Sequence, residues 1–309
     1  MTNTKKISIA LATYNGEKYL SELLDSLLTQ TVLPDEIVVS DDCSKDNTIQ
    51  ILRDYSKKLP IKVLCNESNL GVNKNFEKAV KMCSGDYILI CDQDDVWLPN
   101  NIEKKICILE KMPQHLPMLV FSQSIVTDKN LRILQKRKLS KDIVDWRLLL
   151  TKHGQGTTMA FNRMLCNVLP KQWPNDFNIF PYDYYIYLTA LLTGNVYTSK
   201  DALMFYRTHD NNASLKVSKF KNILKQIFPT YKLYQDRISV EMMNNMKWLL
   251  SAIDEKKIIA ERKDCFEAIS KCNNEKKIDW IRFLNIENVP RSIKLRSLLG
   301  TMAFFFKDL

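Results

Sequence analysis

The sequence predicts an α/β fold in which a mostly parallel sheet is covered by helices on both faces. Over the first 125 residues, short β-rich apolar runs alternate with longer segments whose apolar residues recur at helical spacing. Such near-continuous apolar runs are typical of strands buried on both faces. Their alternation with helices favours right-handed βαβ units and therefore a parallel sheet.

Each expected element of this region follows from a local pattern. The strands are short apolar runs at Ile7–Leu11, Ile37–Val39, Ile61–Leu64, Tyr87–Cys91 and Met118–Ser122. The first helix carries leucines at i, i+3, i+4 spacing, namely Leu20, Leu23, Leu24, Leu27 and Leu28. The second helix begins near Asp46, which can cap it, and turns Ile49 and Leu52 inward. Two further helices are expected over Asn73–Met82 and Asn101–Lys111.

The rest of the chain predicts a less regular part and a second region. Thr127–Trp146 is polar and basic and predicts a surface loop, and Gly154–Phe161 predicts a loop that enters a strand. Asp183–Leu192 predicts a helix with Gly194 at its C′ position. Beyond Leu215 the sequence is Lys-rich and helical, without strand signals. We therefore expect a domain over residues 1–214 and a basic, mainly helical region over residues 215–309.

Composition excludes several classes of protein. The net charge is +10, and residues 215–309 hold 19 Lys and Arg against 11 Asp and Glu, so most of the excess lies there. The chain has no signal-peptide pattern and no run near the ~20 apolar residues of a membrane span. Eight scattered cysteines without a CxxC pair indicate reduced thiols and a cytoplasmic protein. Three histidines disfavour a multi-histidine metal centre, seven glycines disfavour glycine-rich nucleotide loops, and no recognisable nucleic-acid-binding module is present.

Acidic residues follow two of the expected strands at the points where the strands end. Asp41 and Asp42 follow one strand, and Asp92, Asp94 and Asp95 follow another. In an open parallel sheet, ligands bind beyond the carboxyl ends of the strands. Three close carboxylates repel one another unless a cation is present, and Mg²⁺ or Mn²⁺ with a diphosphate suits such a cluster. The alternative is that aspartates collect there because they favour turns and caps.

Seven segments, in this order, resemble the motifs of family 2 glycosyltransferases with the GT-A fold. They are Ala12–Gly16, Ile37–Asp46, Asn69–Gly71, Cys91–Trp97, Gly156–Met159, Tyr182–Tyr184 and Tyr206–Asn212. The form of Cys91–Trp97 and of the later segments is similar to bacterial rhamnosyltransferases that build cell-wall, capsular or O-antigen polysaccharides. The match extends to about residue 214. It implies a GT-A, Rossmann-like domain with a helical C-terminal extension.

The resemblance implies roles on the donor side of the site. Asp42, with Asp41, is expected to bind the base of a nucleotide-sugar, and Thr13, Tyr14 and Asn15 to line the same pocket. Asp92 is expected near the ribose or sugar. Asp94 and His209 are expected to hold Mn²⁺ or Mg²⁺, and Arg207 to contact phosphate. From the residues alone, His209 can equally be a surface histidine and Arg207 an exposed charge.

On the acceptor side, Asp183 is the expected catalytic base of an inverting transfer. Its alternative is a helix N-cap, because an aspartate suits that position. Gly156 and Thr157 are expected to line the acceptor site. Tyr184 stands where the family more often has Trp, which bears on acceptor specificity. Trp97 is expected near the sugar, with a place in the core as the alternative.

The expected function is a metal-dependent, inverting transfer of a sugar onto a lipid-linked bacterial polysaccharide acceptor. The favoured donor is dTDP-L-rhamnose, and the alternatives are a UDP-hexose or a non-catalytic sugar-nucleotide-binding subunit. One C-terminal helical face suits an anionic membrane surface, with Leu295, Leu298, Leu299, Met302 and Phe306 flanked by Arg291, Lys294, Arg296 and Lys307. This predicts a peripheral protein on the inner face of the plasma membrane, with packing on the catalytic domain or in a homo-oligomer left open.

Overall fold

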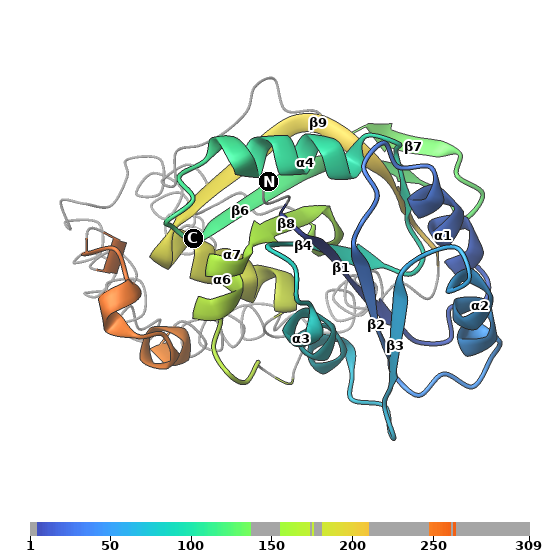
Figure 1. The fold of residues 1–309 in the computed structure, drawn as a ribbon, viewed down its shortest axis with the longest axis horizontal. Coiled ribbons are helices and arrows are strands. Elements are labelled where there is room, and N and C mark those ends of the chain that lie inside the picture. Colours follow the sequence, from blue (N-terminus) through green and yellow to red (C-terminus); the bar gives the residue numbers. More distant parts are fainter. Residues whose placement is uncertain are drawn as a thin grey trace, which may run out of the picture.

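A computed structural model describes residues 5–136, 155–173, 175, 181–209, 247–260 and 262–263, and its core is one mixed sheet between helices (Figure 1). In the described residues the strands follow the order β3-β2-β1-β4-β8-β6-β9-β5, and β7 pairs with β6. They are β1 (Ile7–Thr13), β2 (Glu36–Asp41), β3 (Ile61–Cys65), β4 (Tyr87–Asp92), β5 (Val96–Trp97), β6 (Met118–Thr127), β7 (Ile133–Lys136), β8 (Met159–Asn162) and β9 (Asn195–Arg207).

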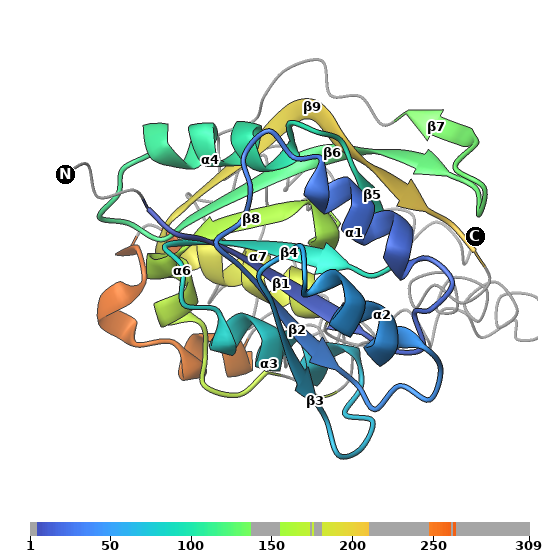
Figure 2. The ribbon, with the colours of Figure 1, turned by 45° about the vertical axis from the view of Figure 1, so that its right-hand side comes forward.

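The described helices lie on both faces of this sheet. They are α1 (Leu20–Leu28), α2 (Thr48–Tyr55), α3 (Val72–Met82), α4 (Asn101–Lys111), α6 (Arg163–Val168) and α7 (Tyr182–Thr193), with short 3-10 turns at η1 (Gly156–Thr158) and η2 (Glu255–Lys257). Figure 2 shows α3, α6 and α7 on the side of the sheet away from α4. This arrangement confirms the predicted fold class of a sheet flanked by helices.

Two hydrophobic cores result from the alternation of side chains along the strands. In β1, Ile9 and Leu11 join the core beneath α1, α2 and α4, whereas Ala10 joins the core beneath α3, α6 and α7. In β4, Leu89 and Ile90 divide between the two cores in the same way. Because successive side chains of a strand point to opposite faces, an apolar run is the pattern that a doubly covered strand requires.

The sheet contains more antiparallel pairing than expected. The pairs β1·β2, β1·β4 and β2·β3 are parallel, as predicted for the first half, and the pair β6·β9 is parallel as well. The pairs β4·β8, β6·β8, β6·β7 and β5·β9 are antiparallel. The strands β5, β7 and β9 were absent from the prediction. β7 lies within the segment expected to be a loop, and its four exposed residues suit an edge strand that buries little.

Gly194 ends α7 as predicted, but for another reason. Its backbone is extended, not left-handed. A Cβ atom there would lie 1.9 Å from the carbonyl oxygen of Pro117, so only glycine permits this close approach of the two chains. The helix therefore stops where its end meets the loop before β6.

A segment of the predicted C-terminal region packs onto α7. Leu249 and Ile253 are buried in the core beneath α3, α6 and α7. The backbone N–H of Ile259 donates to the carbonyl of Leu192 at 3.0 Å, and Arg262 donates to the carbonyls of Leu191 and Gly194. The boundary near Leu215 and the helix over residues 295–306 lie outside the described residues.

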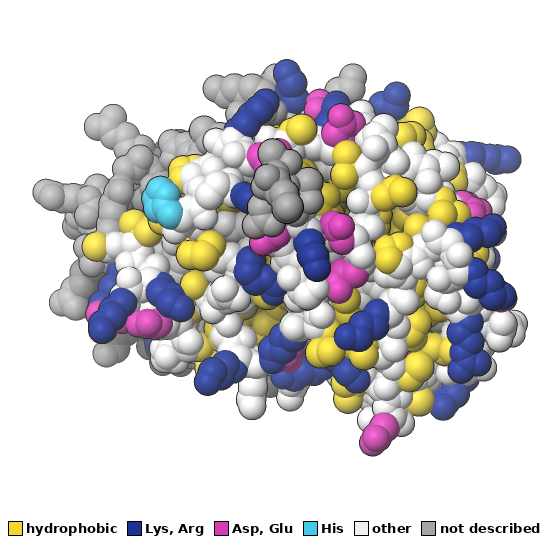
Figure 3. All heavy atoms as spheres, in the orientation of Figure 1, with side chains coloured by type: hydrophobic (Ala, Val, Ile, Leu, Met, Phe, Trp, Pro, Cys, Tyr) yellow, Lys and Arg dark blue, Asp and Glu magenta, His cyan; other side chains and the backbone are white. Residues whose placement is uncertain are grey.

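The face of the molecule in Figure 3 carries side chains of several kinds. Basic side chains are scattered over the face in Figure 3, with uncharged and hydrophobic side chains between them. Among the described helices, none combines the length and apolar character that crossing a bilayer requires.

Candidate active site

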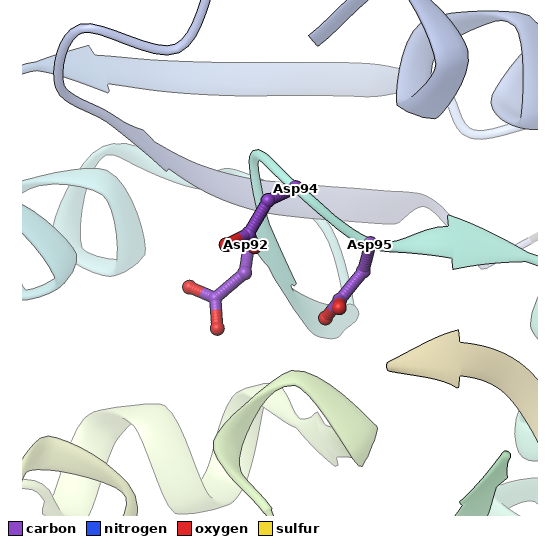
Figure 4. A group of neighbouring side chains, drawn as sticks. All are labelled: Asp92, Asp94 and Asp95. Carbon is purple, nitrogen blue, oxygen red and sulfur yellow. The ribbon is translucent and has the colours of Figure 1, made fainter. Parts of the chain in front are cut away.

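Three carboxylates gather in the loop that follows β4. Asp92, Asp94 and Asp95 each offer an oxygen that lies within 4.8 Å of the other two (Figure 4). Burial, together with repulsion by the Asp94 carboxylate, raises the pKa of both Asp92 and Asp95 well above the ordinary value. Carboxylate oxygens are the ligands that Mg²⁺ and Mn²⁺ prefer, so this set fits the predicted divalent cation.

The end of β9 brings His209 to this loop. Its Nε2 lies 2.8 Å from a carboxylate oxygen of Asp94, and both side chains are largely buried. β9 reaches this position because it pairs with β5, directly after the acidic loop. The two residues predicted as metal ligands are therefore neighbours, and the alternative of an exposed surface histidine is wrong.

Arg207 is buried, so the alternative of an exposed charge is wrong, and its contact with phosphate stays a prediction. Its side chain is 2% exposed and forms an ion pair with Glu22 at 2.8 Å. Its guanidinium also donates to the carbonyls of Asp94 and Lys129, at 2.9 and 2.6 Å, and lies over the ring of Tyr19. The same residue donates its backbone N–H to Asp95. Arg207 therefore fastens the start of α1 and the end of β9 to the acidic loop.

The turn after β1 lies beside the acidic loop. Thr13 is buried and donates its hydroxyl to Asp41 at 2.9 Å. Tyr14 is 47% exposed, so its ring is available to a ligand. Asn15 has a φ of 47° and accepts a hydrogen bond from the backbone N–H of Lys45. Of the three predicted pocket residues, Tyr14 and Asn15 are exposed to solvent and Thr13 is buried.

The two aspartates after β2 are both buried and bind the chain itself. Asp41 accepts hydrogen bonds from the hydroxyl and the backbone N–H of Ser44. Asp42 accepts from the backbone N–H groups of Leu70 and Gly71, at 2.7 and 2.9 Å, and from the amide of Asn66. Both carboxylates brace the loops of the predicted base pocket. Their direct contact with a base stays a prediction.

On the opposite side of the acidic cluster, Asp183 lies in the first turn of α7. Its carboxylate accepts a hydrogen bond from the backbone N–H of Gly156 at 3.1 Å, and its charge contributes to the raised pKa of Asp92. A Cβ at Gly156 would lie 2.4 Å from the Tyr182 hydroxyl and 2.9 Å from Cβ of Asp183. Glycine therefore permits the close approach of α7 to η1, which places Asp183 against η1.

Two predicted acceptor residues are buried: Trp97 takes the place in the core that the sequence left open as its alternative, and the acceptor role of Thr157 stays a prediction. Trp97 is 2% exposed and packs in the core beneath α1 and α4, on the face of the sheet away from α7. Thr157 is 1% exposed, and its hydroxyl lies 3.9 Å from the sulfur of Met204. Tyr184 is partly buried against the core that contains α7, and its acceptor role stays a prediction.

Sequence reasoning assigned no role to Tyr182, which also belongs to this site. Its ring stacks on Phe76 with 4.0 Å between centroids, and its backbone N–H donates to Asn73. Burial raises the pKa of its hydroxyl well above the ordinary value, and the charges of Asp92 and Asp183 add to the effect. The signal in the sequence was an aromatic residue directly before the candidate base.

Comparison with known proteins agrees with this geometry. The model of "Glycosyl transferase family 2" matches residues 8–169. An uncharacterised protein of Mycobacterium tuberculosis is 27% identical over 212 residues, which cover 66% of this chain and 59% of the relative. This chain thus spans about three fifths of that relative's length. The Escherichia coli protein WfgD, named a UDP-Glc:alpha-D-GlcNAc-diphosphoundecaprenol beta-1,3-glucosyltransferase, is 27% identical over 71% of this chain and 83% of its own.

A solved structure shares the fold. Staphylococcus aureus TarS 1-349 in complex with UDP-GlcNAc matches with a TM-score of 0.60 and 23% identity, over 93% of this chain and 82% of that chain. The similarity extends through the sheet that carries the acidic loop, so the GT-A architecture expected from the sequence is confirmed. The chain belongs to glycosyl transferase family 2, and the matched residues include the acidic loop with Asp94.

Proposed function

We propose that this protein transfers a hexosyl group from a UDP- or dTDP-linked donor to a saccharide acceptor, with inversion at the reacting carbon. One observation carries the proposal. The backbone N–H of Gly156 in η1 donates to the Asp183 carboxylate at 3.1 Å, and η1 packs against β4, whose last residue is Asp92. A candidate base and a candidate cation site thus lie on neighbouring elements.

In such a transfer, Asp183 takes the proton of the acceptor hydroxyl as the acceptor oxygen bonds to the anomeric carbon. The bond from that carbon to the diphosphate oxygen breaks, and the diphosphate leaves with the electron pair. The first turn of a helix favours a charged carboxylate, and two backbone N–H groups, of Gly156 and Tyr184, already donate to Asp183. These contacts orient the base.

Asp94 and His209 are the residues that would hold Mg²⁺ or Mn²⁺, with Asp92 beside them. A bound divalent cation offsets the negative charge of the departing diphosphate, so that no strong general acid is needed. Arg207 keeps the loop of Asp94 in place through its carbonyl oxygen. The position of the candidate cation site therefore depends on the end of β9.

The relatives favour a UDP-linked hexose as donor. WfgD is named for UDP-Glc, and one TarS structure is a complex with UDP-GlcNAc. The form of Cys91–Trp97 favours the second candidate, dTDP-L-rhamnose. Uracil and thymine offer the same imide N–H to a carboxylate, so Asp42 suits either base.

A lipid-linked saccharide is the proposed acceptor, supported by the diphosphoundecaprenol in the name of WfgD. Such an acceptor requires contact with a membrane surface. The basic segment Arg291–Lys307 suits that contact by its composition, although it lies outside the described residues.

Thermal unfolding with a panel of UDP-, dTDP- and GDP-sugars, each with and without Mn²⁺, tests the proposal. A ligand that binds only the folded state raises the melting temperature. We expect a Mn²⁺-dependent rise with a UDP-hexose or with dTDP-rhamnose, and none with GDP-sugars. No rise with any nucleotide at saturating concentration would support the non-catalytic subunit instead.

A further inference from the structure

Gln93 forms a two-point hydrogen bond across the site. It lies between Asp92 and Asp94 in the acidic loop, and its side-chain amide pairs with the backbone of Tyr14. Its Oε1 accepts from the Tyr14 N–H at 2.9 Å, and its Nε2 donates to the Tyr14 carbonyl at 2.9 Å. The parallel pairing of β1 with β4 ends with Ala12 opposite Asp92, so this amide extends the ladder by one side chain.

Gly16 leaves the space that the Gln93 amide occupies. A Cβ atom on Gly16 would lie 2.3 Å from Oε1 and 2.7 Å from Cδ of Gln93. The φ of Gly16 lies outside the left-handed region, so its backbone conformation alone does not require glycine. The close approach of the amide is therefore the reason that this position suits glycine.

The far side of the same turn is fastened to the loop after β2. The N–H of Asn15 donates to the Ser44 hydroxyl at 2.9 Å, and its side-chain oxygen accepts from the N–H of Lys45 at 2.8 Å. The N–H of Gly16 donates to the Thr48 hydroxyl at 2.7 Å. The turn that presents Tyr14 is therefore held between two loops, and Gln93 supplies the contact to the acidic loop.

We propose that Gln93 is a positioning residue that fixes the separation between the turn at Tyr14 and the carboxylate of Asp94. The inference rests on the proposed function, in which the turn meets the base of a nucleoside diphosphate and Asp94 binds the cation at its diphosphate. Both ends of that ligand bind together only when the two loops keep one spacing. Gln93 thereby makes two weak subsites act as one site.

The amide is the side chain that suits this task. One backbone residue offers one donor and one acceptor, and a planar amide offers their complements in the same plane. Glutamate can accept from the N–H but sets an anion against the carbonyl and adds a charge beside Asp92, Asp94 and Asp95. Asparagine is one methylene shorter and cannot span the same distance.

The test measures two affinities in the full chain. The Kd of Mn²⁺ without nucleotide reports the acidic loop, and the Kd of UDP and of dTDP with saturating Mn²⁺ reports both subsites. For Gln93→Met, which keeps the length and loses both hydrogen bonds, we expect the Mn²⁺ Kd to stay within about twofold. The Kd of the nucleoside diphosphate should rise by about tenfold, as for the loss of two ordinary hydrogen bonds. The matched control is Gln50→Met, which replaces an exposed glutamine of α2 and should change neither the Mn²⁺ Kd nor the nucleotide Kd.

A double-mutant cycle identifies the partner and covers the case in which Gln93→Met folds poorly. Gly16→Ala in the wild-type background should weaken nucleoside diphosphate binding about as much as Gln93→Met, because the new methyl group displaces the amide. In a Gln93→Ala background, the same glycine substitution should have no further effect on that Kd. At the level of turnover, KM for the donor should rise in each variant, with kcat at saturating donor nearly unchanged.

The outcomes separate this inference from the proposed function. If the wild type binds neither UDP nor dTDP with Mn²⁺, both are overturned. If the wild type binds and Gln93→Met binds equally well, the positioning role alone is wrong. Equal losses of Mn²⁺ and nucleotide affinity in Gln93→Met, or additive losses in the cycle, would likewise overturn it, because they indicate a general disturbance of the loop.

Discussion

The imidazole of His209 lies 2.8 Å from the carboxylate of Asp94, although 115 positions separate the two residues. The pairing of β9 with β5, directly after the acidic loop, produces this contact. The last strand of the described domain thus completes a site that begins at the end of β4.

Removal of either partner should weaken metal binding. We expect Asp94→Ala and His209→Ala each to raise the Kd of Mn²⁺ by at least about tenfold, since even residues that only orient a metal ligand cost about 10–100-fold. Isothermal titration with Mn²⁺ measures the effect. His115→Ala is the control, because that exposed histidine precedes β6, whose first residue pairs with the start of β9, whereas His209 follows the end of β9. Unchanged Mn²⁺ affinity in both variants would exclude this pair as ligands.

The base assignment rests on Asp183. Asp183→Asn keeps the shape and still accepts the N–H of Gly156, but it cannot take a proton. We expect kcat to fall by about 10²–10⁴-fold while the donor-induced rise in melting temperature persists. Asp201→Asn, at a half-exposed carboxylate paired with Lys104, is the control and should remain active. Full activity of Asp183→Asn would show that another group accepts the proton.

In the ion pair of Arg207 with Glu22, the arginine is buried and the glutamate is half-exposed. Substitution of the arginine should therefore destabilise the protein more than substitution of the glutamate. Arg207→Met leaves the Asp94 and Lys129 carbonyls without this donor and should lower the free energy of unfolding by about 1–3 kcal/mol for each carbonyl. Glu22→Gln, whose side chain is 50% exposed, should cost only about 0–1 kcal/mol. Urea unfolding of both variants measures the difference. If both variants lost a similar free energy of unfolding, the ion pair and not the carbonyl contacts would account for the contribution of Arg207.

Lys105 predicts a pH dependence of stability. Its ammonium is fully buried in α4, and burial lowers its pKa from 10.5 to about 7. Between these two values the unfolded chain binds a proton that the folded chain does not, so this group makes stability rise with pH by about 1.4 kcal/mol per unit. Lys105→Met removes that rise.

The stability advantage of Lys105→Met over the wild type should therefore be largest near pH 7 and shrink as the pH approaches 10. Urea unfolding of both proteins across this range measures it, because effects of other titrating groups largely cancel in the difference. A constant difference at every pH would indicate that Lys105 keeps its proton in the folded state.

The strands β1, β2 and β4 were predictable because they are buried on both faces and therefore read as apolar runs. The strand β3 is only partly buried, but its sequence is also a short apolar run. The strand β9 was not predictable, since its mixed polar and apolar sequence NVYTSKDALMFYR depends on its long pairing with β6. The acidic loop and Asp183 were found from residue type and position. The role of Arg207 could not be predicted, because its partner Glu22 lies 185 residues away and the sequence does not show which charges pair. For Trp97, the sequence left open a place near the sugar or a place in the core, and its burial shows that it lies in the core.

The contacts of Arg262 with the end of α7 have a consequence for where this domain can be cut. Without residues 247–263, the carbonyls of Leu191, Leu192 and Gly194 lose their donors, and Leu249 and Ile253 no longer cover the apolar helix that carries Asp183. The unit that folds therefore extends beyond the last motif of the family. A fragment that ends at residue 214 would contain every residue of the site but would lack part of the structure that holds α7, and with it Asp183, in position.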